Sequence, residues 1–171
     1  ANLMSRDRTV ATRLEFDTSD NLMLYAAGGY RYGNSEQDFP SARTPHAVDD
    51  FRNPRNLNAW YDAESRNRTG EVGARAKFET GGVKHLLTAS GSLLKSEASS
   101  FFLSAPVSQT ITSSIYNPVK LIPMTGVRLS PTKNSETELT SFSLTDTLSF
   151  ANDRVLVTGG VRKQQVKVEN F

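Results

Sequence analysis

Hydrophobic and polar residues alternate with a period of two along three separate stretches of the chain. In the first stretch, Leu14 and Phe16 share one face, while Arg13 falls on the other. The same alternation returns in residues 71–93 and 141–162. Successive strand residues point to opposite faces of a sheet, whereas a helix places its apolar residues three and four apart. The pattern therefore predicts β-strands with one apolar face each.

Each stretch is interrupted once by a short polar segment that favours a turn. These segments are DTSDN (17–21), ETGG (79–82) and ANDR (151–154), which are rich in the residues that hairpin loops prefer. Each stretch is therefore predicted to be a hairpin, which gives six strands. Two residues break the alternation, because Asp146 falls on an apolar face and Leu86 on a polar one.

Much longer segments join one hairpin to the next. They span Gly33–Thr69 and Ser99–Ser135 and contain many Pro, Asn, Ser and charged residues. We expect loops here, with the strands extending into them. Short turns at one end and long loops at the other are typical of an outer-membrane β-barrel, whose apolar face meets lipid and whose polar face meets water. A soluble β-sandwich or barrel with an inward apolar face remains the alternative.

Three phenylalanines stand just before the short turns. Phe16, Phe78 and Phe150 each close the first strand of a hairpin. Aromatic residues at matching heights form the girdles at the two surfaces of a membrane. We therefore predict that these three residues are membrane-interface aromatics.

The composition narrows the function classes. The chain has 171 residues, 37% of them hydrophobic, with a net charge of +2 and no cysteine. This charge does not suggest a nucleic-acid partner, and the lack of cysteine excludes thiolate metal sites and disulfides. No catalytic motif is present, so no catalytic residue and no enzymatic activity is predicted. His46, Asp49 and Asp50 are close in sequence, but we interpret them as a solvated loop rather than a metal site.

The amino-acid sequences of the hairpins resemble those of a known family. RLEFDTSDNLMLYAAGGYRY (13–32) and, more specifically, DTLSFANDRVLVTGGVR (146–162) resemble the barrel of TonB-dependent siderophore receptors. The resemblance implies an all-β fold, an antiparallel meander of long hairpins forming part of a transmembrane β-barrel of about 22 strands. Residues 1–171 would then be a partial barrel domain with about six or more strands, without the plug domain.

The resemblance also implies a location and partners. It places the protein in the outer membrane of a Gram-negative bacterium, in contact with outer-membrane lipid. It implies uptake of a ferric siderophore, with iron only as substrate and no cofactor, and contact with the TonB complex through the missing plug region. A passive porin segment and a soluble ligand-binding β-domain remain alternatives.

Candidate ligand-binding residues are the aromatic and basic residues in or near the long segments. Aromatic side chains offer flat area to bulky chelates, and basic residues attract anionic ones. The candidates are Arg31, Phe39, Trp60, Tyr61, Phe101, Phe102 and Tyr116. The alternative for each residue is that it binds no ligand and lies in the outer aromatic girdle or on the solvated surface.

Overall fold

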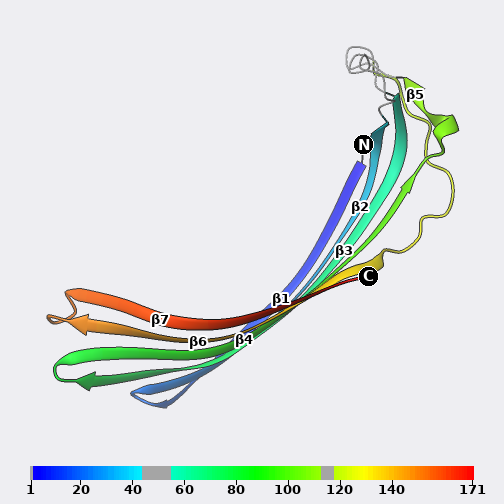
Figure 1. Ribbon diagram of the computed structural model, residues 1–171. Helices are drawn as coiled ribbons and strands as arrows, with labels where there is room; N and C mark the ends of the chain where they lie inside the picture. Colours follow the sequence, from blue (N-terminus) through cyan, green and yellow to red (C-terminus); the bar gives the residue numbers. More distant parts are fainter. Residues whose placement is uncertain (1, 44–54, 113–117) are drawn as a thin grey trace. The chain divides into compact units, whose positions relative to one another are not determined.

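The computed structural model of the protein describes residues 2–43, 55–112 and 118–171, and it is almost entirely β-structure (Figure 1). Its elements are β1 (Asn2–Ser19), β2 (Leu22–Arg43), β3 (Arg55–Thr80), β4 (Val83–Ser104), the 3-10 turn η1 (Val107–Gln109), β5 (Ile111–Thr112), β6 (Thr132–Phe150) and β7 (Val155–Asn170). The six long strands form one sheet in the order β1-β2-β3-β4-β6-β7, and β5 pairs with β3. No helix among the described residues is long and apolar enough to cross a membrane. The predicted antiparallel meander of hairpins is confirmed.

All three predicted hairpin turns are present, and they lie at the same end of the sheet (Figure 1). The turn between β3 and β4 places Gly81 and Gly82 at φ 59° and 81°, a region that glycine enters without steric cost. The turn between β6 and β7 instead holds Ala151, Asn152 and Asp153 at positive φ. The turn segments recognised in the sequence therefore set the ends of the strands.

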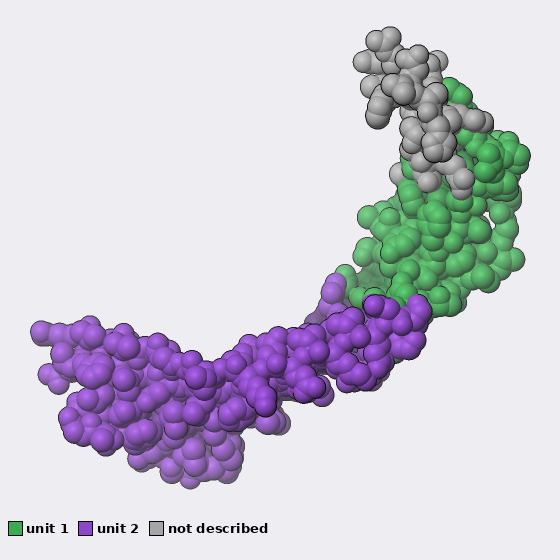
Figure 2. All heavy atoms as spheres, in the orientation of Figure 1, with its two compact units in different colours: residues 1–7, 33–65, 98–134 green, residues 8–32, 66–97, 135–171 purple. Residues whose placement is uncertain are grey.

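The strands reach far into the segments that the sequence predicted to contain loops. β2 continues to Arg43 and β3 begins at Arg55, while β4 continues to Ser104 and β6 begins at Thr132. The chain divides into two compact units, each made from parts of several strands (Figure 2). One unit contains residues 1–7, 33–65 and 98–134, and the other, the turn unit, contains residues 8–32, 66–97 and 135–171.

One face of the turn unit is apolar and open. Its exposed members include Val10, Leu14, Phe16, Leu24, Tyr30, Val72, Phe78, Leu93, Phe142, Leu144, Val157 and Val161. Val72 on β3 is 62% exposed and Phe142 on β6 is 56% exposed although both strands are flanked by neighbours, which is unusual for large apolar side chains on the inner strands of a sheet. A sheet must cover an apolar face with another layer, and no second layer is present among the described residues. Lipid is the cover that suits such a face.

The opposite face of the turn unit carries cross-strand hydrogen bonds between hydroxyl groups. Ser90 and Ser143 are 2.8 Å apart, and Ser92 and Ser141 are 2.7 Å apart, each pair joining β4 to β6. Arg162 on β7 donates to the Ser141 hydroxyl at 2.9 Å. Polar side chains that satisfy one another in this way suit a face in contact with water, as the alternation predicted.

Tyr25 is the buried aromatic residue of this polar face. Its hydroxyl donates to Glu71 at 2.9 Å, and the Arg13 guanidinium lies 4.4 Å from its ring centroid. The ring lies over Gly73, where a Cβ atom would come within 2.5 Å of the Tyr25 ring and 2.7 Å of the Ala89 carbonyl oxygen. The absence of a side chain at residue 73 therefore makes the space that the ring fills.

The assignment of the two faces predicts opposite responses to an added charge. Leu144 lies six residues from Phe150, roughly 14 Å across a membrane for a tilted strand, which is near the middle of the apolar band. We expect Leu144→Arg to lower the free energy of unfolding of the complete barrel by about 2–4 kcal/mol. Thr88→Arg, on the polar face, is the matched control and should cost less. Unfolding titrations in lipid with the reverse order would contradict the assignment.

The space above Gly73 gives a second prediction. Gly73→Ala should lower the free energy of unfolding by about 1–3 kcal/mol, because the added methyl group collides with the Tyr25 ring and with a backbone oxygen that cannot move freely. Gly70→Ala is the control, because a Cβ atom there meets nothing within 4 Å. Equal unfolding midpoints for the two variants would show that the ring does not depend on the glycine.

Candidate functional site

Two of the predicted ligand-binding aromatics meet in the unit that contains the long connections. The ring centroids of Phe39 on β2 and Phe102 on β4 are 6.4 Å apart, and the rings are tilted by 43°. β3 lies between these strands, so the two rings meet across it. Leu57 and Ala59 on β3 are fully buried. The pair leaves Phe102 more than half exposed, so an apolar surface remains available to a ligand.

Alternation within this unit separates the candidates into two groups. Gly33 lies against the side chains of Asp7 and Ser65, so the odd-numbered residues of β1, β2 and β3 share a face. Phe39 and Tyr61 belong to that face by their position in the strands, and Phe102 joins it through its ring contact. We call this the Phe39–Phe102 face.

The remaining candidates lie elsewhere. Trp60 falls on the face opposite the Phe39–Phe102 face, as does Phe101 by alternation along β4. Arg31 is exposed and belongs to the turn unit. Tyr116, and likewise His46, Asp49 and Asp50, lie outside the described residues. The ligand-binding role of all seven candidates stays a prediction.

Arg128, which the sequence analysis did not identify as a candidate, binds several residues on the face that carries Trp60. Arg128 donates to both carboxylate oxygens of Asp62, through Nε at 2.7 Å and Nη2 at 2.5 Å. It also donates to Asp38 at 3.2 Å, and its guanidinium lies 5.2 Å from the Trp60 ring centroid. The hydrogen bonds to Asp62 raise the pKa of Arg128, which keeps the guanidinium charged. Trp60 is therefore engaged by a residue of the chain itself.

This contact fastens a long connection to the strands. Residues 118–131 form no regular secondary structure, and Arg128 joins them to β2 and β3 through Asp38 and Asp62. Asp62 is only 5% exposed, so its charge depends on the guanidinium for compensation. The partners are 66 and 90 residues apart in sequence, and neither hydrophobic period nor turn composition could pair them.

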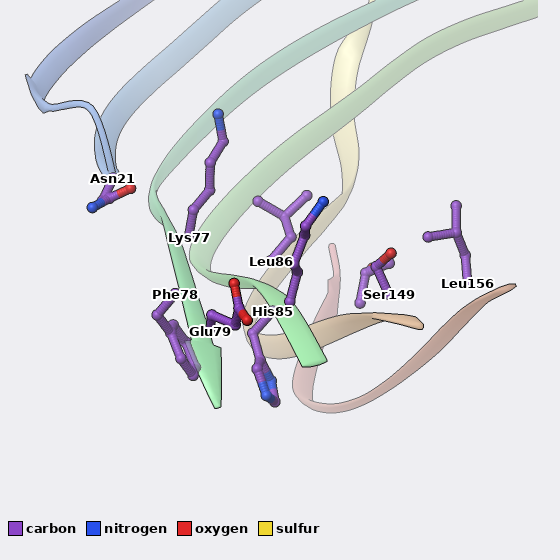
Figure 3. A pocket seen from close by; sticks show the side chains of 10 residues that line it. Asn21, Lys77, Phe78, Glu79, His85, Leu86, Ser149 and Leu156 are labelled. Carbon is purple, nitrogen blue, oxygen red and sulfur yellow. The ribbon is translucent and has the colours of Figure 1, made fainter. Parts of the chain in front are cut away.

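The turn unit holds a separate hollow of about 740 Å³ at the hairpin end (Figure 3). Lys77, Leu86 and Leu156 are among the residues that line it. Leu86, which interrupts the alternation on the polar face, is thus part of the wall of this hollow. At its rim Lys84 donates to Asp153 at 2.8 Å. That bond, followed by one from Ser149, lowers the pKa of Asp153.

The role of Arg128 can be tested by removing its charge. We expect Arg128→Met to leave Asp62 buried without a partner and to release residues 118–131, raising their hydrogen-exchange rates roughly 100-fold. Lys120→Met removes an exposed cation from the same segment and should change exchange little. The double variant Arg128→Met/Asp62→Asn should recover part of the loss, since no unpaired charge remains. Unchanged exchange in Arg128→Met would show that other contacts hold the segment.

Comparison with known proteins supplies the family context. No protein-family model matches the chain, and no curated protein matches it in sequence. Solved structures do match. The ferric preacinetobactin receptor BauA from Acinetobacter baumannii is similar over 98% of this chain, with 27% identity and a TM-score of 0.75. The ferric-catecholate import receptor Fiu from E. coli K12 is similar over 96% of the chain, with 17% identity and a TM-score of 0.67.

A third match extends the likeness in fold. The siderophore receptor PiuA from Acinetobacter baumannii is similar over 97% of the chain, with 12% identity and a TM-score of 0.58. The chain spans 25%, 26% and 29% of BauA, Fiu and PiuA, respectively. The exposed apolar face, the common end of the three turns and these matches agree. The chain therefore has the fold of a section of the barrel wall of TonB-dependent siderophore receptors and is a protein of the outer membrane.

Proposed function

We propose that this chain is part of a receptor that binds a ferric siderophore and imports it across the outer membrane. The observation that carries the proposal is the likeness to the ferric preacinetobactin receptor over nearly the whole chain. Iron enters as part of the substrate and not as a resident cofactor. The chain takes no part in covalent chemistry, in keeping with the three solved structures named above, which are receptors.

We assign the first contact with the siderophore to the Phe39–Phe102 face. Its two rings present a flat apolar surface, and the half-buried Tyr61 adds a hydroxyl group that can form a hydrogen bond. Trp60 lies on the other face under Arg128, so it contributes by holding the connection rather than by touching the ligand. Several residues of this face would share the binding energy.

Energy for import would come from the TonB complex, through a plug domain. The polar face of the turn unit, with its serine pairs and Arg162, would then line the interior in which such a plug sits. A passive porin would need the same wall but no plug. The matches to receptors favour the energised transporter over the porin.

The assignment predicts that the aromatic pair matters for capture. In the complete receptor, Phe39→Ala/Phe102→Ala should weaken ferric siderophore binding about tenfold or more, because two stacking surfaces of roughly 1 kcal/mol each are lost. Binding of radioiron-loaded siderophore to whole cells at low temperature measures capture without transport. The siderophores to test are those on which the source organism grows.

Tyr30→Ala is the control for this experiment. Tyr30 is an exposed aromatic on the apolar face of the turn unit, so its loss should leave siderophore binding unchanged. The amount of folded barrel in the membrane is compared across variants by its heat-dependent mobility in gels. Wild-type affinity in the double variant, for every siderophore tested, would remove the Phe39–Phe102 face from the capture surface.

A further inference from the structure

Two ionisable side chains stand on the apolar face of the turn unit, where lipid is the expected neighbour. They are His85 on β4 and Asp146 on β6. Asp146 follows Leu144 and precedes Leu148 on the same face, and Gly159 lies opposite it on β7. An ionised carboxylate on a lipid-facing surface is unfavourable unless something compensates it. The presence of this pair on a lipid-facing surface therefore needs a physical explanation other than the packing of the strands.

The two residues are arranged as a unit with Phe78. The Nδ1 atom of His85 and the Oδ2 atom of Asp146 are 2.8 Å apart. Because a carboxylate oxygen can only accept a hydrogen bond, Nδ1 is the protonated ring nitrogen and its N–H group donates the hydrogen bond. The Phe78 ring stacks on the imidazole, with centroids 4.6 Å apart and planes within 5° of parallel. Figure 3 shows Phe78 and His85 on the side of the sheet opposite Lys77 and Leu86.

The groups of this cluster that can still interact with a ligand favour a cation. With Nδ1 protonated, the Nε2 atom of a neutral imidazole offers a lone pair. The other carboxylate oxygen, Oδ1, is buried and receives no hydrogen bond, so the negative charge of Asp146 is incompletely compensated. The Asp146 side chain is 32% exposed, so an outside group can approach it. Phe78 is 46% exposed, and an exposed face of its ring attracts a cation.

The position of the cluster selects the kind of cation. Phe78 lies two residues before the end of β3, next to the turn at Gly81 and Gly82. Short turns of outer-membrane barrels face the periplasm, and aromatics near them lie at headgroup level. The groups at this depth belong to phospholipids, and the cationic group with N–H donors among them is a primary ammonium. A metal ion fits less well, since the described residues contain no group of three potential ligands.

We propose that Asp146, His85 and Phe78 form a binding site for the primary ammonium headgroup of phosphatidylethanolamine on the periplasmic side of the barrel. The ammonium group donates to the Nε2 atom of His85 and lies near the Asp146 carboxylate, while the Phe78 ring borders it. The proposal depends on the outer-membrane location and not on the identity of the siderophore.

Native mass spectrometry of the complete detergent-solubilised barrel tests the site. Phosphatidylethanolamine, phosphatidylcholine and phosphatidylglycerol with identical acyl chains are added one at a time. Phosphatidylethanolamine should be retained about tenfold more than the other two, because only its headgroup combines a positive charge with N–H donors. Equal retention of the three lipids would overturn the proposal and show only an unselective lipid annulus.

Single substitutions test whether phosphatidylethanolamine binds at these three residues. Asp146→Asn should reduce phosphatidylethanolamine retention to the level of the other lipids, and Phe78→Leu should reduce it less. Asp153→Asn is the matched control, because it removes a carboxylate at the same end of the barrel that is already paired with Lys84. Selectivity that survives in folded Asp146→Asn would overturn the site. Siderophore binding is measured on the same samples and should not change, which separates a failure of this site from a failure of the receptor function.

Discussion

The structure depends on a single constraint, which is that one layer of sheet must satisfy all its backbone groups by strand pairing while leaving an apolar face uncovered. Four of the six long strands, β2, β3, β4 and β6, are paired on both sides, and β1 and β7 at the edges of the sheet are paired on one side among the described residues. A soluble domain would fold a second layer onto the apolar side, and here lipid takes that place. Polar residues consequently gather on the other face, where the serine pairs and Arg162 bond to one another.

The same constraint explains why exceptions on the apolar face are informative. In a soluble core, a His–Asp pair could be satisfied by many neighbours from a facing layer. On a lipid-facing surface the neighbours are few, and the pair meets one aromatic ring and one another. In the other unit the corresponding problem is solved from within the chain, since Arg128 compensates the buried Asp62. The two carboxylates thus have different solutions, one internal and one that requires an outside partner.

The strands and turns of the turn unit could be read from the sequence, because lipid on one side and water on the other impose strict alternation. Gly29 lies against the side chains of Ala11 and Thr69, which places the odd-numbered residues of β1 to β3 on one face and Leu14, Phe16 and Val72 on the other, as the alternation predicted. It gave no strand ends for β2, β3 and β4 beyond the turn unit, because both faces there carry polar residues and the hydrophobic period disappears. The pairing of Arg128 with Asp62 could not be predicted from the sequence either, because it joins a segment without regular secondary structure to a strand residue 66 positions away.

The Tyr25 ring over Gly73 has a consequence for how β2 and β3 find their alignment during folding. Hairpin turns fix the alignment of β1 with β2 and of β3 with β4, whereas β2 ends at Arg43 and β3 begins only at Arg55. A slip of two residues would keep the polar and apolar faces correct, so face chemistry alone does not prevent it. It would, however, bring Glu71 or Arg75 beneath the ring in place of the one residue without a side chain. The glycine therefore leaves room for the ring in a single alignment of β2 with β3, and this alignment determines how the first hairpin pairs with the second.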